Sequence, residues 1–292
     1  LNYDKNNDYE AEWYYADGSG NLYAGEFKTI KGKKYAFRND GRMVNGLKFI
    51  NEDENFDVKA DDDGTYPFDD EDKFNENAPK LEKAGYKCYY FGNGDDGAMR
   101  TNKTTISIDG DNYNFYFEKS GGNKGAGLTG DKDDKYYQSG KLLKAGSDEK
   151  YQVVEATGTS TAEQAKGASK FTYSKVDDAK DFLGKSDIDA ITVTKDDYDL
   201  TDKDDVAQLE NDLKAVGINK KIDDISELYI FKETKTDSKG KDTTSYGVDK
   251  NKYFLVNTSG KVIDSKSKNK DGNDYQYVVA KGGQILAIYV ED

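Results

Sequence analysis

The feature that most constrains the fold is a short phrase that recurs along the chain. It reads aromatic, any residue, aromatic or apolar, three polar residues, glycine, any residue, apolar. The clearest copies are Tyr35–Met43 (YAFRNDGRM) and Phe115–Gly121 (FYFEKSG), with looser copies at Phe254–Val262 (FLVNTSGKV) and Tyr277–Ile285 (YVVAKGGQI). Apolar alternation around a polar, glycine-containing step is typical of a β-hairpin. A recurring hairpin predicts an architecture of repeats, in which function lies on a repeated surface.

Two copies of one unit follow each other between residues 13 and 50, with a spacing of 21 residues. At this spacing, Tyr14 corresponds to Tyr35, Gly20 to Gly41, Leu22 to Met43 and Gly25 to Gly46. A period near 20 residues is typical of a solenoid. One hairpin is only marginally stable in water, so three or more must bury each other's aromatic faces. The expected fold class is therefore mainly β, with stacked antiparallel β-hairpin repeats in a solenoid-like array and a small α+β segment.

Five segments are expected along the chain. They are hairpin repeats at 9–50, an acidic loop with a short helix at 51–84, diverged hairpin repeats at 85–150, an α+β insertion or diverged region at 151–248, and terminal hairpin repeats at 249–292. In the second segment Phe74, Ala78 and Leu81 have helical spacing. Pro79 lies among them and is expected to shorten the helix, because proline lacks the amide hydrogen.

The segment 151–248 differs in character from the repeats. Its strands are expected at Ile188–Val193 and Leu228–Phe231, where β-branched and aromatic residues cluster. The strongest helix signal in the chain lies between them, at Asp204–Val216. One apolar stripe runs along it, made of Val206, Leu209, Leu213 and Val216. Thr201 or Asp202 is the expected N-cap and Gly217 the expected C-cap.

The amino-acid composition indicates a folded protein and limits the kinds of partner that it can bind. Charged residues make up 34% of the 292 residues, a share typical of disorder, but 13% are aromatic, with 23 Tyr and 13 Phe. Disordered segments lack aromatic residues, so we expect a folded protein with a thin core. The net charge is −14, which disfavours nucleic acid and anionic membrane surfaces as partners. A cationic or neutral ligand is compatible with this charge.

The chain has one cysteine, Cys88, and no histidine. An internal disulfide is therefore impossible, and Ser-His-Asp and Cys-His catalysis within the chain are excluded. Cys88 is flanked by aromatic residues and is expected to be a half-buried strand residue. No run of about 18 apolar residues exists, so no membrane span is expected. The chain begins at Leu1, as either a secreted chain freed of its signal peptide or a trimmed cytosolic chain would.

The stretch Trp13–Ile50 resembles the cell-wall-binding repeats of Gram-positive surface proteins, a group that includes choline-binding and glucan-binding modules. The usual family phrase is G-W-x-x-x-x-G-x-W-Y-Y-F-x-x-x-G-x-M-x-T-G-W. Matches in the first copy are Trp13-Tyr14-Tyr15, Gly20 and Gly25, and in the second Gly32, Tyr35-Ala36-Phe37, Gly41, Met43 and Gly46. The likeness is good over about 40 residues, weaker over about 100 more, and does not extend to 151–248.

The resemblance implies stacked hairpins that attach a protein to choline on teichoic acid or to glucan. In choline-binding members, aromatic rings of successive hairpins enclose the quaternary ammonium through cation–π contacts. Four residues map onto those ring positions: Trp13, Tyr15, Tyr35 and Phe37. The tryptophan that follows glycine in the family is absent after Gly25 and after Gly46. Phe27 is the fifth candidate, one residue beyond that position, and a one-residue shift on a strand turns the side chain to the other face.

No catalytic residue, metal ligand or cofactor is assigned from the sequence. In an EF-hand, glycine stands at position 6 and glutamate at position 12 of the loop. With Gly272 at position 6, position 12 is Val278, and with Gly64 at position 6, position 1 is Lys59. Neither loop is an EF-hand, and calcium sites of other loop types stay open. Among 57 acidic residues no pair is singled out for glycoside hydrolysis.

The sequence thus predicts a non-catalytic, secreted or cell-surface binding module of the cell wall. Its expected partners are cell-wall polysaccharide or teichoic acid, with choline as a candidate ligand. One alternative is a spacer or adhesin that contacts host or bacterial surface proteins. The other is a glycan-active enzyme that uses acidic residues.

Overall fold

The computed structural model describes residues 12–62 and 64–292, with the backbone alone at 267 and 268. Residues 9–11 of the first expected segment therefore lie outside the described residues. The chain divides into two compact units. Unit 1 comprises the chain up to Lys132, Tyr136–Leu142 and Gly158–Tyr173, and unit 2 comprises Asp133–Lys135, Leu143–Thr157 and Ser174–Asp292. The division between the units falls inside the expected segments 85–150 and 151–248.

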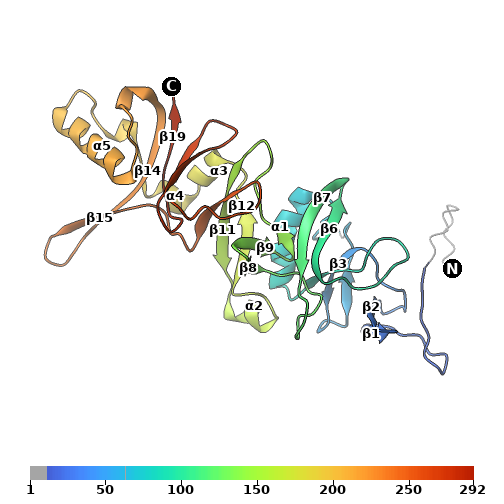
Figure 1. Cartoon of the computed structure of the whole chain (residues 1–292). Coiled ribbons are helices and arrows are strands. Elements are labelled where there is room, and N and C mark those ends of the chain that lie inside the picture. Colours follow the sequence, from blue (N-terminus) through green and yellow to red (C-terminus); the bar gives the residue numbers. More distant parts are fainter. Residues whose placement is uncertain (1–11, 63) are drawn as a thin grey trace. The chain divides into compact units, whose positions relative to one another are not determined.

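Unit 1 consists of short antiparallel sheets and two helices (Figure 1). Its strands are β1 Glu26–Ile30, β2 Lys33–Phe37, β3 Leu47–Asn51, β4 Asp57–Lys59, β5 Lys87–Tyr90, β6 Asn102–Ile108, β7 Asp111–Phe117, β8 Gly130–Lys132, β9 Lys135–Gln138 and β10 Lys141–Leu142. They form the sheets β1-β2, β4-β3-β5 and β6-β7-β10-β9-β8. The helices are α1, Glu71–Lys83, and α2, Thr161–Ala165. Fully buried phenylalanines fill the core: Phe49, Phe68, Phe74, Phe115 and Phe117.

Helix α1 corrects the expectation that proline would shorten it. The helix begins after the N-cap Asp70, whose side chain accepts from the Lys73 amide, and continues through Pro79 to Lys83. Phe74 and Leu81 on its buried face are at most 1% exposed. Each such side chain contributes about 1.5–3 kcal/mol. Together they offset the roughly 3 kcal/mol that an internal proline costs.

Unit 2 contains the longer strands and helix α5 (Figure 1). Its elements are β11 Tyr151–Gly158, α3 Ala179–Leu183, α4 Ser186–Asp189, β13 Thr192–Thr194, η1 Lys195–Asp197, α5 Lys203–Val216, η2 Ile222–Asp224, β14 Ile225–Thr236, β15 Asp242–Tyr246, β16 Tyr253–Asn257, β17 Ser267–Lys270, β18 Gln276–Val279 and β19 Ile285–Glu291. Strand β12, Phe171–Lys175, spans the boundary between the units. Strands β13, β14, β19, β18 and β17 lie side by side in that order, with β15 also paired to β14.

The segments 151–248 and 249–292 share this sheet, because β14 of the first pairs with β19 of the second. The same is true of β11, which pairs with β16. The strand expected at Leu228–Phe231 is confirmed as part of β14. The strand expected at Ile188–Val193 is wrong in its first half, where α4 forms and buries Ile188 at 1% exposure. Burial of one isoleucine in a packed core thus decides the local structure over its β propensity.

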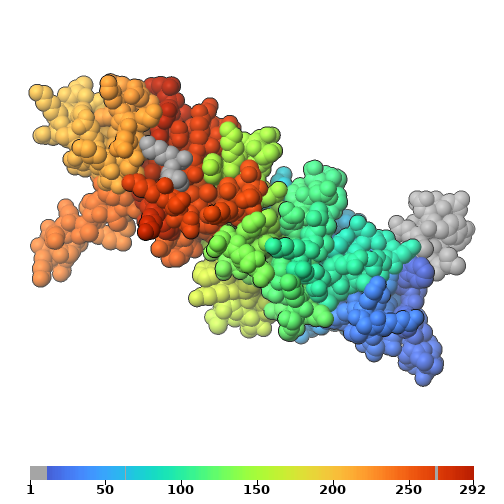
Figure 2. Space-filling view, viewed as in Figure 1, coloured from blue at the N-terminus to red at the C-terminus, as the bar shows by residue number. Residues whose placement is uncertain are grey.

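Helix α5 confirms the sequence prediction closely. Asp202 is its N-cap and accepts from the amides of Asp204 and Asp205, and Gly217 ends it at a φ of 82°. Positive φ at this position is the reason for glycine. The helix packs along β14 (Figure 1), with Leu209, Leu213 and Val216 buried against that sheet. In Figure 2 the β14–β15 hairpin, in orange, projects beyond the rest of unit 2, and its tip residues are exposed.

One kind of turn recurs in both units, at three of the quoted copies of the phrase and at three other places. In each case the first residue of a five-residue turn donates its amide to the carbonyl of the fifth. The pairs are Asp17–Asn21, Arg38–Arg42, Asp237–Lys241, Asn257–Lys261, Asp271–Tyr275 and Ala280–Gln284, at 2.8–3.1 Å. The fourth residue has positive φ every time: Gly20, Gly41, Gly240, Gly260, Asp274 and Gly283. This is the three-residue hairpin loop with a left-handed fourth residue.

The phrase at Phe115–Gly121 forms a longer loop, because the amide of Glu118 meets the carbonyl of Ala126. The other three copies of the phrase have the short turn. The described residues therefore make a mainly β protein with antiparallel sheets and few helices.

Candidate functional site

Two successive hairpins of unit 1 bring their aromatic residues together. Met43, on the return strand of the second hairpin, donates its amide to the carbonyl of Trp13 at 2.7 Å. On β2, Tyr35 and Phe37 lie two residues apart and share one face, while Ala36 on the other face is buried. The backbone therefore aims the Tyr35 and Phe37 rings at the segment that carries Trp13.

The resulting hollow is a cavity of about 390 Å³. It is lined by Trp13, Tyr14, Tyr15, Ile30, Lys31, Lys33, Tyr35, Phe37, Met43, Asp95 and Asp96. Four of the five aromatic residues proposed from the sequence, Trp13, Tyr15, Tyr35 and Phe37, thus lie around one space. We call this space the aromatic cavity.

The rings of the aromatic cavity differ in exposure. Trp13 is 52% exposed and Tyr15 41%, whereas Phe37 is 1% exposed. Tyr15 stacks on Tyr23 with ring centres 5.9 Å apart, and Tyr23 contacts Phe37 at 6.0 Å. The buried ring of Phe37 thus supports the exposed ring of Tyr15 through Tyr23. Exposed, supported aromatic rings are unusual in a folded protein unless they contact a partner.

A loop far away in the sequence completes the cavity. Asp95 accepts a hydrogen bond from Trp13 Nε1 at 2.8 Å, which fixes the plane of the indole. Asp96 forms an ion pair with Arg100. Lys31 and Lys33 line the cavity from the β1–β2 hairpin. The rim therefore offers carboxylates and ammonium groups around a floor of aromatic rings.

Phe27 is not part of the aromatic cavity. In the β1–β2 pair it lies opposite Ala36, and cross-strand partners share a face. Its ring packs in the core, 5.1 Å from the rings of Phe56 and Tyr89 and 6.4 Å from that of Phe91. The one-residue shift from the family position therefore places Phe27 on the face away from Tyr35 and Phe37.

Several residues of the cavity were not among the candidates. Tyr14 lies between Trp13 and Tyr15, both of which were candidates, so its position in the sequence was enough to predict that it belongs to the site. Lys31 and Lys33 flank Gly32, which the sequence indicated only as a match to the family phrase. Nothing in the sequence indicates that Asp95 and Asp96 belong to the site, because tertiary folding alone brings their loop to the hairpins.

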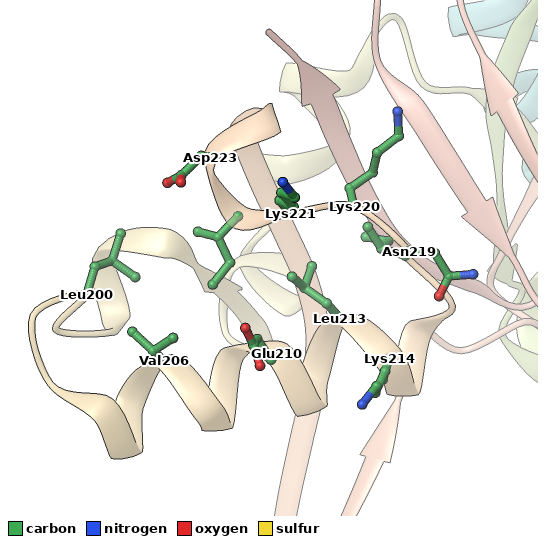
Figure 3. Close-up of a pocket in the computed structure, with 11 residues that line it drawn as sticks. Leu200, Val206, Glu210, Leu213, Lys214, Asn219, Lys220, Lys221 and Asp223 are labelled. Atoms are coloured by element: carbon green, nitrogen blue, oxygen red, sulfur yellow. The ribbon is translucent and has the colours of Figure 1, made fainter.

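Unit 2 contains a larger pocket of about 670 Å³ between α5 and the segment 218–223. Figure 3 shows Leu200, Val206 and Leu213 around it, with Lys214 and Lys221 among its polar residues. No aromatic residue lines it. Its aliphatic walls offer no ring for stacking or for a cation–π contact.

Cys88 lies on β5 and is 1% exposed. Burial raises the pKa of its thiol, and the charge of Glu82 adds to the effect. A buried, protonated thiol is a poor nucleophile. In residues 12–62 and 64–292 no three His, Cys, Asp or Glu side chains are grouped so as to hold a metal ion. No helix in this range is long and apolar enough to span a membrane.

Comparison with known proteins gives no family match: no family model and no curated protein matches the chain. Among solved structures, the chain is similar to a multimodular pneumococcal cell-wall endolysin from phage Cp-1 complexed with choline, at 17% identity over 48% of this chain and 33% of that one, with a TM-score of 0.23. It is also similar to choline binding protein F of Streptococcus pneumoniae, at 24% identity over 46% and 38% of the two chains, with a TM-score of 0.16.

A third similar structure is the modular autolysin LytC of Streptococcus pneumoniae, at 11% identity over 97% of this chain and 48% of that one, with a TM-score of 0.18. The chain thus covers between a third and a half of each of these three proteins. Superpositions with TM-scores of 0.16–0.23 do not establish a common fold.

Proposed function

We propose that this chain is a non-catalytic, surface-located module that binds a cell-wall glycan or teichoic acid through the aromatic cavity. The observation that carries the proposal is the group of exposed rings, Trp13, Tyr14 and Tyr15, which line one cavity together with the buried ring of Phe37. Such a surface loses water-exposed apolar area when a ligand covers it. The wall of a bacterium is the partner that the resemblance of this same stretch implies.

The side chains of the aromatic cavity suit both the sugar rings and the charged groups of such a polymer. The apolar faces of sugar rings stack on aromatic side chains, and a quaternary ammonium binds over them through cation–π contacts. The carboxylates of Asp95 and Asp96 favour a cation or sugar hydroxyls. Lys31 and Lys33 can pair with the phosphates of a teichoic acid.

Stacking of the two hairpins supports a repeat array as the framework of the site. The turn of the second hairpin rests on the first, because a β-carbon at Gly41 would lie 3.3 Å from Tyr14 and 3.6 Å from Leu22. We propose that further hairpins extend this stacking as in the solenoid expected from the sequence.

Retention on isolated Gram-positive cell walls tests the proposal. We expect the wild-type chain to sediment with the walls, and Trp13→Ala and Tyr15→Ala each to lower the affinity about 10-fold, the loss of one aromatic contact. Leu200→Ala is the control, since Leu200 is also an exposed large hydrophobic residue, at 45%, and does not line the aromatic cavity. A wild-type chain that stays in the supernatant would contradict the proposal.

Two competitors separate the two ligands. Free choline should release the chain if choline on teichoic acid is bound. Release by soluble wall polysaccharide, with no effect of choline, would assign the cavity to glycan. Binding that neither competitor affects, and that Trp13→Ala leaves unchanged, would place the interaction elsewhere on the chain.

A further inference from the structure

A small cavity in unit 2 gathers oxygen atoms from three separate parts of the chain. Its volume is about 10 Å³, close to that of one water molecule or one monatomic ion. Its walls include Glu149, Gln152, Asp177, Asp178, Asp271 and Tyr277. We call it the acidic cavity. It lies within unit 2 and is independent of the function proposed above.

Gln152 supplies a buried oxygen atom without a partner. The residue lies on β11 and is 4% exposed. Its Nε2 donates to the carbonyl of Val176 at 3.2 Å, which fixes the orientation of the amide and leaves Oε1 for the cavity. Among the described residues, Gln152 Oε1 is the buried side-chain nitrogen or oxygen that lacks a hydrogen bond. A buried acceptor without a donor is unfavourable unless a bound group satisfies it.

Three carboxylates of the cavity each accept hydrogen bonds from backbone amides with one of their two oxygens. Glu149 Oε2 accepts from the Gly146 amide, Asp178 Oδ1 from Asp181, and Asp271 Oδ1 from Asn273 and Tyr275, at 2.8–2.9 Å. For each carboxylate the second oxygen has no hydrogen bond to the described residues. No described lysine or arginine forms an ion pair with Glu149, Asp178 or Asp271.

The charge of Asp271 is not required by its turn. Asp237 and Asn257 occupy the same position in equivalent turns, and each accepts from the same two amides. Asn257 shows that a neutral amide oxygen performs this role. Asp271 is nevertheless 6% exposed.

Close backbone packing holds the walls in place. Gly272 donates its amide to the carbonyl of Glu149 at 3.0 Å. A β-carbon at Gly272 would lie 1.8 Å from the carbonyl oxygen of Asp148, so no other residue fits without moving one loop. The turn that carries Asp271 is therefore fixed against the loop that carries Glu149.

We propose that the acidic cavity is a calcium site, with Gln152 Oε1 and the second carboxylate oxygens of Asp271 and Asp178 as ligands. Ca²⁺ takes 6–8 oxygen ligands, including amide and backbone carbonyl oxygens and water. Carboxylates alone do not make the site, since no three of them are grouped to hold a metal. The mixed oxygen set is the kind that Ca²⁺ accepts, and the net charge of −14 favours a cation.

Terbium luminescence tests the site directly, because Tyr277 in the cavity wall can sensitise a bound Tb³⁺ ion. We expect tyrosine excitation of the whole chain to give saturable Tb³⁺ emission, which added Ca²⁺ displaces with a Kd of about 0.1–1 mM, the range of extracellular loop sites. In a separate measurement without Tb³⁺, millimolar Ca²⁺ should raise the temperature of thermal unfolding, because ligand binds only the folded state.

Two asparagine variants provide the comparison. Asp271→Asn keeps the turn, as Asn257 demonstrates, and should weaken Ca²⁺ binding by more than 10-fold. Asp237→Asn makes the same change in an equivalent exposed turn and should bind as the wild type does. Gln152→Leu should weaken binding while removing the unsatisfied oxygen.

The outcomes decide between an ion and a water molecule in the cavity. Saturable emission that Asp271→Asn abolishes and Asp237→Asn leaves intact supports the calcium site. Equal loss in both variants means non-specific binding to surface carboxylates and overturns the proposal. No effect of Ca²⁺ on emission or on thermal unfolding also overturns it and assigns the cavity to water alone.

Discussion

The indole Nε1 of Trp13 donates a hydrogen bond to Asp95 Oδ1 at 2.8 Å, across 82 residues of sequence. This contact joins the hairpin that contains Trp13 to the loop that follows β5. It orients an aromatic ring that is 52% exposed and that would otherwise have several rotamers available. The aromatic cavity therefore depends on a carboxylate that belongs to no repeat.

Asp95→Ala should weaken wall binding by roughly 2- to 10-fold, which corresponds to the loss of one hydrogen bond of about 0.5–1.5 kcal/mol. The ring remains, but it is no longer held in the binding orientation. Sedimentation with isolated walls measures the affinity, and the emission of Trp13, the single tryptophan, reports the change in its surroundings. Asp62→Ala, at an exposed loop position, is the control and should change neither quantity.

Gly41→Ala should destabilise unit 1 more than Gly20→Ala does. The two glycines occupy equivalent turn positions with the same φ of 85°, so the backbone strain of about 1 kcal/mol is common to both. A β-carbon at Gly41 would approach Tyr14 at 3.3 Å, whereas at Gly20 nothing lies within 4 Å. Urea unfolding followed by tryptophan emission gives the difference in free energy. Equal losses would show that the second turn does not rest on the first hairpin.

Asp212→Ala should destabilise unit 2 by about 3 kcal/mol, the cost of breaking a buried ion pair. Asp212 is 0% exposed and pairs with Lys232 at 2.8 Å. It also accepts from the hydroxyls of Tyr198 and Tyr246, each at 2.5 Å. Its removal leaves an ammonium and two hydroxyls without their acceptor. Chemical denaturation followed by circular dichroism measures the loss.

The same carboxylate should make unit 2 sensitive to acid. Burial tends to raise the pKa of Asp212, but the hydrogen bonds from Lys232, Tyr198 and Tyr246 outweigh it and hold the pKa below its ordinary value. A depressed folded-state pKa gives stability that is present above pH ~4 and lost as pH falls through the folded pKa. Asp212→Asn should therefore flatten the dependence of unfolding free energy on pH below 4. A wild-type slope in Asp212→Asn would contradict this assignment.

Pro79→Ala should stabilise unit 1 by about 1–3 kcal/mol, because the amide hydrogen missing from proline is restored inside a continuous helix. The flanking buried residues Phe74 and Leu81 keep the helix in place in both variants. Thermal unfolding measures the gain. Glu76→Ala on the exposed side of the same helix loses one surface ion pair with Lys80 and should change stability by less than about 0.5 kcal/mol. An unchanged or lower stability of Pro79→Ala would mean that α1 is adapted to its proline.

The turns and α5 were predictable because their causes are local. A polar first residue and a glycine or aspartate in the fourth place favour the five-residue turn, as at Asp17–Asn21 and Asn257–Lys261, although Glu118 and Gly121 have the same pattern and belong to a longer loop. Helix α5 likewise depends on its own apolar stripe and on caps at Asp202 and Gly217. These interactions join residues that are a few positions apart, so both partners of each interaction can be recognised within one short stretch of sequence.

Tertiary structure alone decided which face and which distant residue each side chain meets. The register of β1 against β2 placed Phe27 beside Ala36 and away from Tyr35, and the core decided that α1 would continue through Pro79. Asp95 reached Trp13, and Gln152 reached the loop of Asp271, only when the chain had folded. The sequence by itself thus determined the hairpins, because each turn is satisfied by its own backbone hydrogen bonds. The two cavities required the fold, because their walls come from segments up to about 130 residues apart, which packing alone brings together.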